Sequence, residues 1–270
     1  MKMKINKYSM YDDSSFTKGR IPQYIQWVKS GGDLDCYVDY KVTTGSIAKK
    51  SIAILIEPRS IQPRVYEYME EHGNRFKYVF THDSMLLNKL DNAKLLLFGG
   101  VYGSYTVPKT KNISIVSSNK EMCELHRIRT DLAKILEVSD KVDCYGTYNG
   151  GDFSSTEKIY GPYKYSIVIE NYQDDNWFTE KICNAFASRT VPIYYGARNI
   201  GKYFNSLGII QLDDPYAALD VVEKLDCNKD YLKRLPGIIA NYELVKRFYC
   251  FEDWFHTEYQ ELLEEVANGE

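Results

Sequence analysis

The sequence predicts an α/β protein with two Rossmann-like domains that face a cleft. Short apolar runs alternate with helix-like segments in two successive series, and a loop with Gly103, Pro108 and several lysines separates them. Alternation of this kind is typical of parallel sheets with right-handed crossover connections. A chain of 270 residues with 44% apolar residues is large enough to form two such cores.

The first series has the pattern βαβαβ. Its strands are expected at 51–58, 76–83 and 93–100, and its helices at 62–73 and 84–92. Gly73 is expected to end the first of these helices. We therefore place an N-terminal domain at residues 1–108.

The second series is longer and ends in two helices. Its strands are expected at 112–119, 142–146, 165–171, 190–196 and 208–212, and its helices at 120–137, 179–188, 214–226 and 241–267. We place the second domain at residues 109–245 and a C-terminal helix at residues 246–270.

The composition argues against several classes of protein. A net charge of −3 disfavours a general binder of nucleic acids or anionic membranes. No apolar run approaches the roughly 20 residues of a membrane helix, and the N-terminus lacks the apolar core of a signal peptide. The six cysteines are scattered without a CxxC pair, which disfavours metal or redox chemistry. We expect a soluble, cytoplasmic protein.

Polar residues and glycines follow several of the expected strands. They are Glu57, Ser117-Ser118-Asn119, Gly146, Glu170-Asn171 and Gly196. In parallel sheets, ligands bind beyond the carboxyl ends of the strands. Strand ends are also where polar residues begin in any protein, so this position alone assigns no function.

The start of the helix at 179–188 carries charge. A helix N-terminus attracts anions, and Lys181 adds a full positive charge there. Glu180 could accept hydrogen bonds from ribose hydroxyls, and Glu170 and Asn171 could bind other hydroxyls of the same ligand. The alternative is a plain helix cap, with Thr179 as the capping residue and Glu180 in the first turn.

One window carries a family resemblance. The segment YKYSIVIENYQDDNWFTEKICNAFASRTVPIYYG, residues 163–196, closely resembles the donor-binding signature of glycosyltransferase family 10, the α1,3/4-fucosyltransferases. That signature is a strand ending in Glu-Asn, then Tyr-x-Thr-Glu-Lys, a helix and Pro-x-Tyr-x-Gly. The segments FKYVFTHD and ISIVSSNKEMCELHRIR resemble the family's upstream elements, so the similarity spans residues 50–212.

The resemblance implies a GT-B fold whose C-terminal helix returns toward the N-domain. It implies an inverting, metal-independent transfer of L-fucose from GDP-fucose to a hydroxyl of an oligosaccharide, in an α1,3-type linkage, with no cofactor. Such an enzyme would take part in carbohydrate biosynthesis or protein glycosylation, and we expect it to modify a surface glycan or another oligosaccharide.

The resemblance also implies roles for individual residues. Lys181 would pair with the diphosphate, Glu180 would bind ribose or fucose hydroxyls, Asn171 would lie against the donor, and Glu170 would support the strand end. The remaining expected donor contacts are Thr179, the Ser118-Asn119 segment and the aromatic residue Trp177, which stands where the family has Tyr.

An Arg on the helix after the Ser-Asn segment contacts the diphosphate in the family. Arg127 and Arg129 both remain candidates, and the apolar spacing of the helix fits Arg129 better. The family's general base is a Glu at the end of an N-domain strand, which matches Glu57. His82 is the second candidate for the base or a sugar contact, and Asp83 is similar to it.

Two alternatives to a fucosyltransferase remain open. Trp177 and the short N-terminal half are compatible with a transferase that uses a different nucleotide sugar. The chain could also be a nucleotide-binding module without catalytic activity. Replacement of Glu57 separates an enzyme from such a module, because only an enzyme has turnover to lose.

Overall fold

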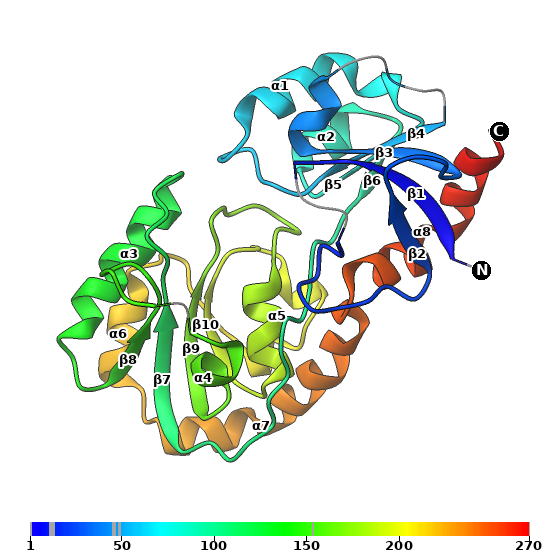
Figure 1. Cartoon of the computed structure of the whole chain (residues 1–270). Coiled ribbons are helices and arrows are strands. Elements are labelled where there is room, and N and C mark those ends of the chain that lie inside the picture. Colours follow the sequence, from blue (N-terminus) through cyan, green and yellow to red (C-terminus); the bar gives the residue numbers. More distant parts are fainter. Residues whose placement is uncertain (1, 11–13, 45–46, 48–49, 153, 270) are drawn as a thin grey trace. The chain divides into compact units, whose positions relative to one another are not determined.

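The computed structural model describes residues 2–10, 14–44, 47, 50–152 and 154–269. The chain forms two compact units (Figure 1). Unit 1 comprises Met1–Gly99, Asp174–Trp177 and Phe248–Glu270, and unit 2 comprises Gly100–Gln173 and Phe178–Arg247. Each unit is built around its own parallel sheet, as the alternation of strands and helices predicts.

Unit 1 has a six-stranded sheet in the order β2-β1-β3-β4-β5-β6, and all of its pairings are parallel. The strands are β1 Met3–Tyr8, β2 Ile25–Val28, β3 Leu34–Val38, β4 Ser51–Leu55, β5 Tyr78–Thr81 and β6 Ala93–Leu95. The helices are α1 Pro63–His72, α2 Ser84–Lys89 and α8 Phe251–Asn268, with the 3₁₀ turns η1 Asp39–Thr43 and η2 Gly73–Arg75.

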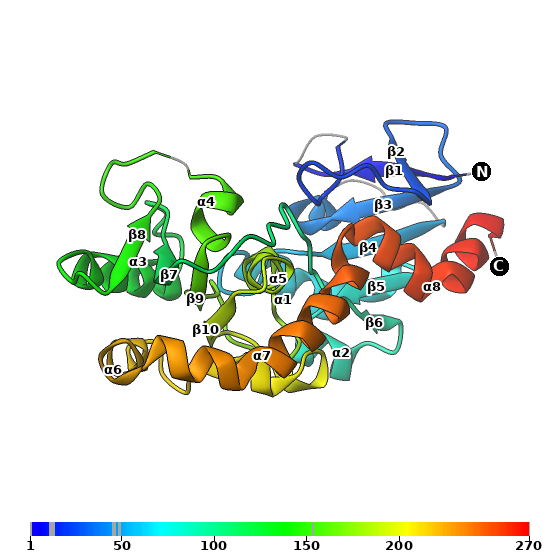
Figure 2. The ribbon, with the colours of Figure 1, turned by 90° about the horizontal axis from the view of Figure 1, so that it is seen from below.

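Helices cover both faces of the unit 1 sheet. Ala53 and Leu55 of β4 pack in one core with side chains of α1 and α2. On the other face, the Phe80 ring of β5 lies 4.7 Å from the Phe255 ring of α8, and Figure 2 shows α8 running along the sheet. Because both faces are covered, every residue of β4 is buried, as is usual for a parallel sheet.

Unit 2 has a five-stranded parallel sheet in the order β11-β10-β9-β7-β8. The strands are β7 Lys111–Val116, β8 Val142–Tyr145, β9 Tyr163–Ile169, β10 Val191–Tyr195 and β11 Ile210–Gln211. The helices are α3 Glu124–Glu137, α4 Thr156–Tyr160, α5 Glu180–Ala187, α6 Ala217–Lys224 and α7 Cys227–Leu244, with the 3₁₀ turns η3 Ile200–Lys202, η4 Ser206–Gly208 and η5 Val245–Phe248.

The sequence prediction was wrong about the terminal helix. A single helix was expected at 241–267, but α7 ends at Leu244, η5 follows, and α8 begins at Phe251. Cys250 has extended backbone angles, so the helical path is interrupted where the chain passes from unit 2 to unit 1. Aromatic residues at helical spacing continue across this interruption, which is why the pattern predicts one helix.

Candidate functional site

Glu170 is the centre of a polar cluster in unit 2. It directly follows β9, and its carboxylate has no exposed surface. It accepts hydrogen bonds from the backbone N–H of Thr179 (3.0 Å), from Thr179 Oγ1 (2.8 Å) and from Lys181 Nζ (3.1 Å). A buried carboxylate is costly unless donors surround it, and these three donors meet that requirement. The Glu170 carboxylate therefore fixes the start of α5.

Lys181 lies at the edge of this cluster. Its side chain is 23% exposed, and its Nζ also lies 3.5 Å from Glu180 Oε1. Burial alone would lower the pKa of Lys181, but the carboxylates of Glu170 and Glu180 outweigh burial and raise it, so the ammonium stays charged. Thr179 caps α5 by accepting a hydrogen bond from the Lys181 N–H, so the helix cap and the charged cluster coexist.

Arg129 adds a second cation to the cluster. It lies on α3, is 6% exposed, and donates from one terminal nitrogen to the carbonyl oxygen of Ile169 (3.0 Å). Burial lowers its pKa and the carboxylates of Glu170 and Glu180 oppose this, but a guanidinium remains protonated at neutral pH. Arg129 Nε has no hydrogen-bond partner within the described residues. Arg127 lies on the exposed face of the same helix.

His126 was not singled out by the sequence. It is buried on the same face of α3 as Arg129, and its Nδ1 lacks a hydrogen-bond partner in the described part of the chain. Burial lowers the pKa of His126 to about 4, helped by the positive charges of Arg129, Lys181 and Lys120. The imidazole is therefore neutral at pH 7. Its spacing of three residues from Arg129 was the available signal, since residues i and i+3 share a helix face.

The other expected donor residues lie at the carboxyl ends of β7 and β9, which are neighbours in the sheet. The carbonyl oxygen of Asn171 accepts a hydrogen bond from Cys123 Sγ (3.1 Å), and that of Ser118 accepts one from Thr130 Oγ1 (3.2 Å). Asn119 is exposed and bonds through its backbone N–H to Thr147 Oγ1 (3.1 Å). The expectation that ligands bind beyond the carboxyl ends of the strands therefore pointed to residues along one connected edge of the unit 2 sheet.

Gly196, the last residue of the predicted signature, supports the same cluster. A Cβ atom at this position would lie 2.6 Å from Glu170 Cγ and 2.3 Å from the hydroxyl oxygen of Tyr194. Both distances are too short for any side chain. Glycine is required here because the Glu170 side chain packs against the backbone that follows β10.

Trp177 and the three residues before it lie in unit 1, whereas the rest of the window 163–196 lies in unit 2. Trp177 is 2% exposed, and its ring centroid lies 4.2 Å from that of His82. The indole is thus covered by protein in this structure. The Trp177 ring is therefore not exposed for the stacking on a nucleotide sugar that the resemblance implies.

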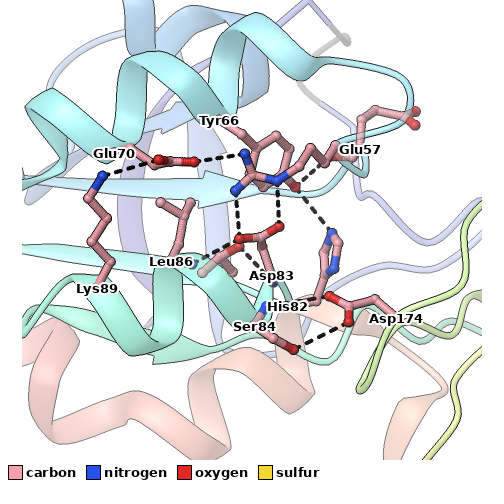
Figure 3. Close-up of polar contacts among 11 residues, drawn as sticks. Glu57, Tyr66, Glu70, His82, Asp83, Ser84, Leu86, Lys89 and Asp174 are labelled. Carbon is pink, nitrogen blue, oxygen red and sulfur yellow. Dashed lines mark hydrogen bonds and ion pairs between the residues drawn. The ribbon is translucent and has the colours of Figure 1, made fainter.

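Glu57 lies in the turn after β4 in unit 1. Its backbone N–H donates to Asp39 Oδ1 (3.1 Å), and its carbonyl oxygen accepts from the hydroxyl of Tyr66 (2.7 Å). The side chain is half-buried, and in Figure 3 its carboxylate points away from Asp83 and Glu70. The backbone N–H and the carbonyl of Glu57 are therefore both held by hydrogen bonds, while its side chain points away from Asp83 and Glu70.

Asp83 has a structural role in the turn next to β5. Its carboxylate accepts two hydrogen bonds from Arg59, at 3.0 and 2.9 Å, and one from the backbone N–H of Leu86 (2.9 Å), which caps α2 (Figure 3). Arg59 also donates to Glu70 (2.8 Å). With these three hydrogen bonds, the Asp83 carboxylate fixes the turn that follows Glu57.

His82 is fully buried between Tyr66 and Trp177. Burial lowers its pKa to about 3; Asp83 opposes this shift and Arg59 reinforces it, so the ring is neutral. The Tyr66 hydroxyl gives its single proton to the Glu57 carbonyl, so the 3.1 Å contact assigns the His82 proton to Nε2, as donor to the Tyr66 oxygen. His82 therefore supports Tyr66 from inside the core.

Among the residues that the structure describes, no three or more His, Cys, Asp or Glu side chains are grouped so that they could hold a metal ion. In the same part of the chain, no helix combines the length and apolar character that crossing a membrane requires.

Comparison with known proteins matches more than half of this chain to one protein family. Residues 106–259 match the model of the C-terminal part of glycosyltransferase family 10 (fucosyltransferase). The α-(1,3)-fucosyltransferase FucT of Helicobacter pylori is 31% identical over 90 residues, which are 32% of this chain and 19% of that protein. The matched segment thus spans about a fifth of the length of that relative.

Solved structures share the fold. An α1,3-fucosyltransferase, solved alone and with GDP, superposes with a TM-score of 0.56 at 16% identity, covering 90% of this chain and 81% of that one. The pneumococcal O-GlcNAc transferase GtfA, solved with UDP and GlcNAc, gives a TM-score of 0.50 at 10% identity, covering 86% and 57%. The chain has the GT-B fold of these glycosyltransferases, as expected from the sequence.

Proposed function

The chain belongs to glycosyltransferase family 10, the fucosyltransferase family, and we propose that it transfers L-fucose from GDP-fucose to a hydroxyl group of an oligosaccharide. The observation that carries this proposal is the cluster of Lys181 and Arg129 around the buried Glu170. It lies at the carboxyl ends of parallel strands, where nucleotides bind in such sheets. The related structure with bound GDP supports the choice of nucleotide.

The two cations would bind the diphosphate of the donor. When the bond between fucose and GDP breaks, negative charge develops on the β-phosphate oxygen. A guanidinium has five N–H donors, and Arg129 gives one of them to the Ile169 carbonyl, so others would remain for this oxygen; Lys181 and the N-terminus of α5 add positive potential. These charges would stabilise the leaving group without a metal ion.

Neighbouring side chains would hold the sugar and the ribose. Glu180 is partly exposed and Asn171 is half-buried, so both can reach hydroxyl groups of a bound donor. Glu170 cannot, because its carboxylate is wholly buried and committed to Thr179 and Lys181. We assign Glu170 the task of holding the cation in place.

Glu57 would act as the general base. Its carboxylate would take the proton of the acceptor hydroxyl as that oxygen attacks the anomeric carbon of fucose. The bond from the anomeric carbon to the phosphate oxygen breaks on the opposite side, and GDP leaves with the electron pair. Attack opposite to the leaving group inverts the configuration, which turns a β-linked donor into an α-linked product.

A transfer assay tests this proposal. The full chain is incubated with radiolabelled GDP-fucose and a panel of oligosaccharides in EDTA, and labelled product is counted. We expect transfer from GDP-fucose that EDTA does not diminish, and none from UDP-GlcNAc. Glu57→Gln should lower the rate at least a hundredfold, as loss of a general base does. The matched control is Glu67→Gln, which removes an exposed carboxylate of α1.

Three results would overturn the proposal in part or as a whole. Transfer from UDP-GlcNAc but not from GDP-fucose would keep a glycosyltransferase and reject fucose as its sugar. Full activity of Glu57→Gln would reject Glu57 as the base. If no nucleotide sugar is used although GDP binds, the chain is a nucleotide-binding module.

A further inference from the structure

Asp39 is a buried carboxylate that the sequence did not single out. It directly follows β3, is 4% exposed, and has a φ angle of 50°. Left-handed backbone angles are unfavourable for residues other than glycine, although aspartate tolerates them better than most. A side chain that is both buried and held in this conformation must be fixed by its surroundings.

Asp39 contacts the turn that carries Glu57. Its Oδ1 accepts hydrogen bonds from two consecutive backbone N–H groups, those of Ile56 (2.7 Å) and Glu57 (3.1 Å). β3 and β4 are parallel neighbours with Val38 opposite Ile54, so their carboxyl ends lie side by side. With the Tyr66 hydroxyl on the Glu57 carbonyl, both backbone polar groups of Glu57 are fixed.

The charge of Asp39 is not needed to hold this turn. A neutral amide oxygen would accept the same two hydrogen bonds without the cost of burying a charge. Oδ2 of Asp39 has no hydrogen-bond partner among the residues that the structure describes. Burial raises the pKa of Asp39 to about 7; the two N–H donors oppose this shift, and the Glu57 carboxylate adds to it.

We infer that Asp39 is a positioning residue for Glu57: Oδ1 fixes the Glu57 backbone, and the ionised carboxylate favours movement of the acceptor proton onto Glu57. This inference rests on the proposed role of Glu57 as the base. A negative charge beside the base stabilises the positive charge that arrives with the proton. The titratable groups that face Asp39 are Glu57 in its turn, Tyr66 on α1 and Cys36 on β3.

Two variants separate the two roles of Asp39. Asp39→Asn keeps an oxygen for the N–H groups of Ile56 and Glu57 but removes the charge, and Asp39→Ala removes both. We expect Asp39→Asn to match the unaltered chain at pH 6, where Asp39 itself is largely protonated, and to fall about tenfold below it in kcat at pH 8. Asp39→Ala should lose more than tenfold in kcat at both pH values, with the Kd for GDP unchanged.

Amide hydrogen exchange gives a readout that does not depend on activity. The amide hydrogens of Ile56 and Glu57 should exchange slowly in the unaltered chain and in Asp39→Asn, and at least tenfold faster in Asp39→Ala. Equal exchange in all three proteins would overturn the positioning role. A kcat profile of Asp39→Asn that follows the unaltered chain from pH 6 to pH 8 would overturn the role of the charge.

The same experiment separates this inference from the proposed function. If Glu57→Gln keeps full activity while Asp39→Ala loosens the turn, Glu57 is not the base and Asp39 only supports the fold. If Glu57→Gln is inactive but Asp39→Ala is fully active, the base assignment stands and the inference about Asp39 fails.

Discussion

The Nζ atom of Lys181 lies 3.1 Å from Oε2 of Glu170, a carboxylate with no exposed surface. The pair joins the end of β9 to the start of α5, because Glu170 and Lys181 are eleven residues apart in the chain but adjacent in space. Lys181 keeps part of its surface exposed, so it can contact a ligand while Glu170 anchors it.

Lys181→Met should lower the free energy of unfolding by about 2–3 kcal/mol, because it leaves the buried Glu170 with Thr179 as its remaining side-chain partner. This value is below the roughly 3–5 kcal/mol expected for a fully buried pair, because Lys181 is partly exposed. Urea denaturation followed by circular dichroism measures this change. Lys134→Met, an exposed lysine on α3, is the control and should change stability by less than 0.5 kcal/mol. A similar small effect of Lys181→Met would show that the ion pair does not stabilise the fold.

Arg129→Gln should weaken GDP binding by about 10- to 100-fold, because a charge-assisted hydrogen bond contributes roughly 1.5–3 kcal/mol. Arg127→Gln should weaken it less than threefold, since Arg127 lies on the exposed face of α3. Calorimetric titration at one fixed salt concentration measures both. The reverse order of the two effects would assign the diphosphate contact to Arg127.

Tyr66→Phe should lower kcat about tenfold, because it removes the hydroxyl that holds the Glu57 carbonyl and leaves His82 Nε2 without its partner. The KM for the donor should stay the same. Tyr68→Phe on the same helix is the matched control, since Tyr68 bonds to Arg75 and not to the Glu57 turn. Steady-state kinetics separate the two parameters, and a change in KM alone would contradict this role of Tyr66.

Asp39→Asn should become more stable relative to the unaltered chain as the pH rises from 5 to 8. The pKa of Asp39 is about 7 in the folded protein, against an ordinary 3.8. Folding therefore favours the protonated acid, and the stability that this provides at low pH is lost as the pH rises through about 7. The asparagine variant has no such loss, so the difference should grow by roughly 1.4 kcal/mol per pH unit below 7 and then level off. Denaturation curves at several pH values check this, and a constant difference would contradict the raised pKa.

Much of the fold follows from hydrophobic periodicity. The expected strands at 51–58 and 165–171 contain β4 and most of β9, and the expected helix at 120–137 contains α3. These segments are predictable because their apolar spacing matches the packing they make. β1 and α7 were both missed because some of their residues disfavour the structure that they form. β1 contains Lys4, Asn6 and Lys7 but is held between two neighbouring strands, and α7 contains Pro236, which removes a helix hydrogen bond.

The candidate site was only partly predictable. The signature pointed to Glu170, Thr179 and Lys181, which the structure brings into direct contact. Asp39 was missed because it follows β3, a short strand that the sequence did not indicate. Periodicity also carries no signal that residues 174–177 pack within unit 1, because that packing depends on the contact of Trp177 with His82, far away in sequence.

The most direct test is a calorimetric titration of the full chain with GDP, UDP and CMP in EDTA, repeated with Lys181→Met and with the control Lys134→Met. We predict that GDP binds, that UDP and CMP do not, and that Lys181→Met alone abolishes binding. Binding of UDP in preference to GDP, or GDP binding that survives Lys181→Met unchanged, would contradict a GDP-fucose site at Lys181.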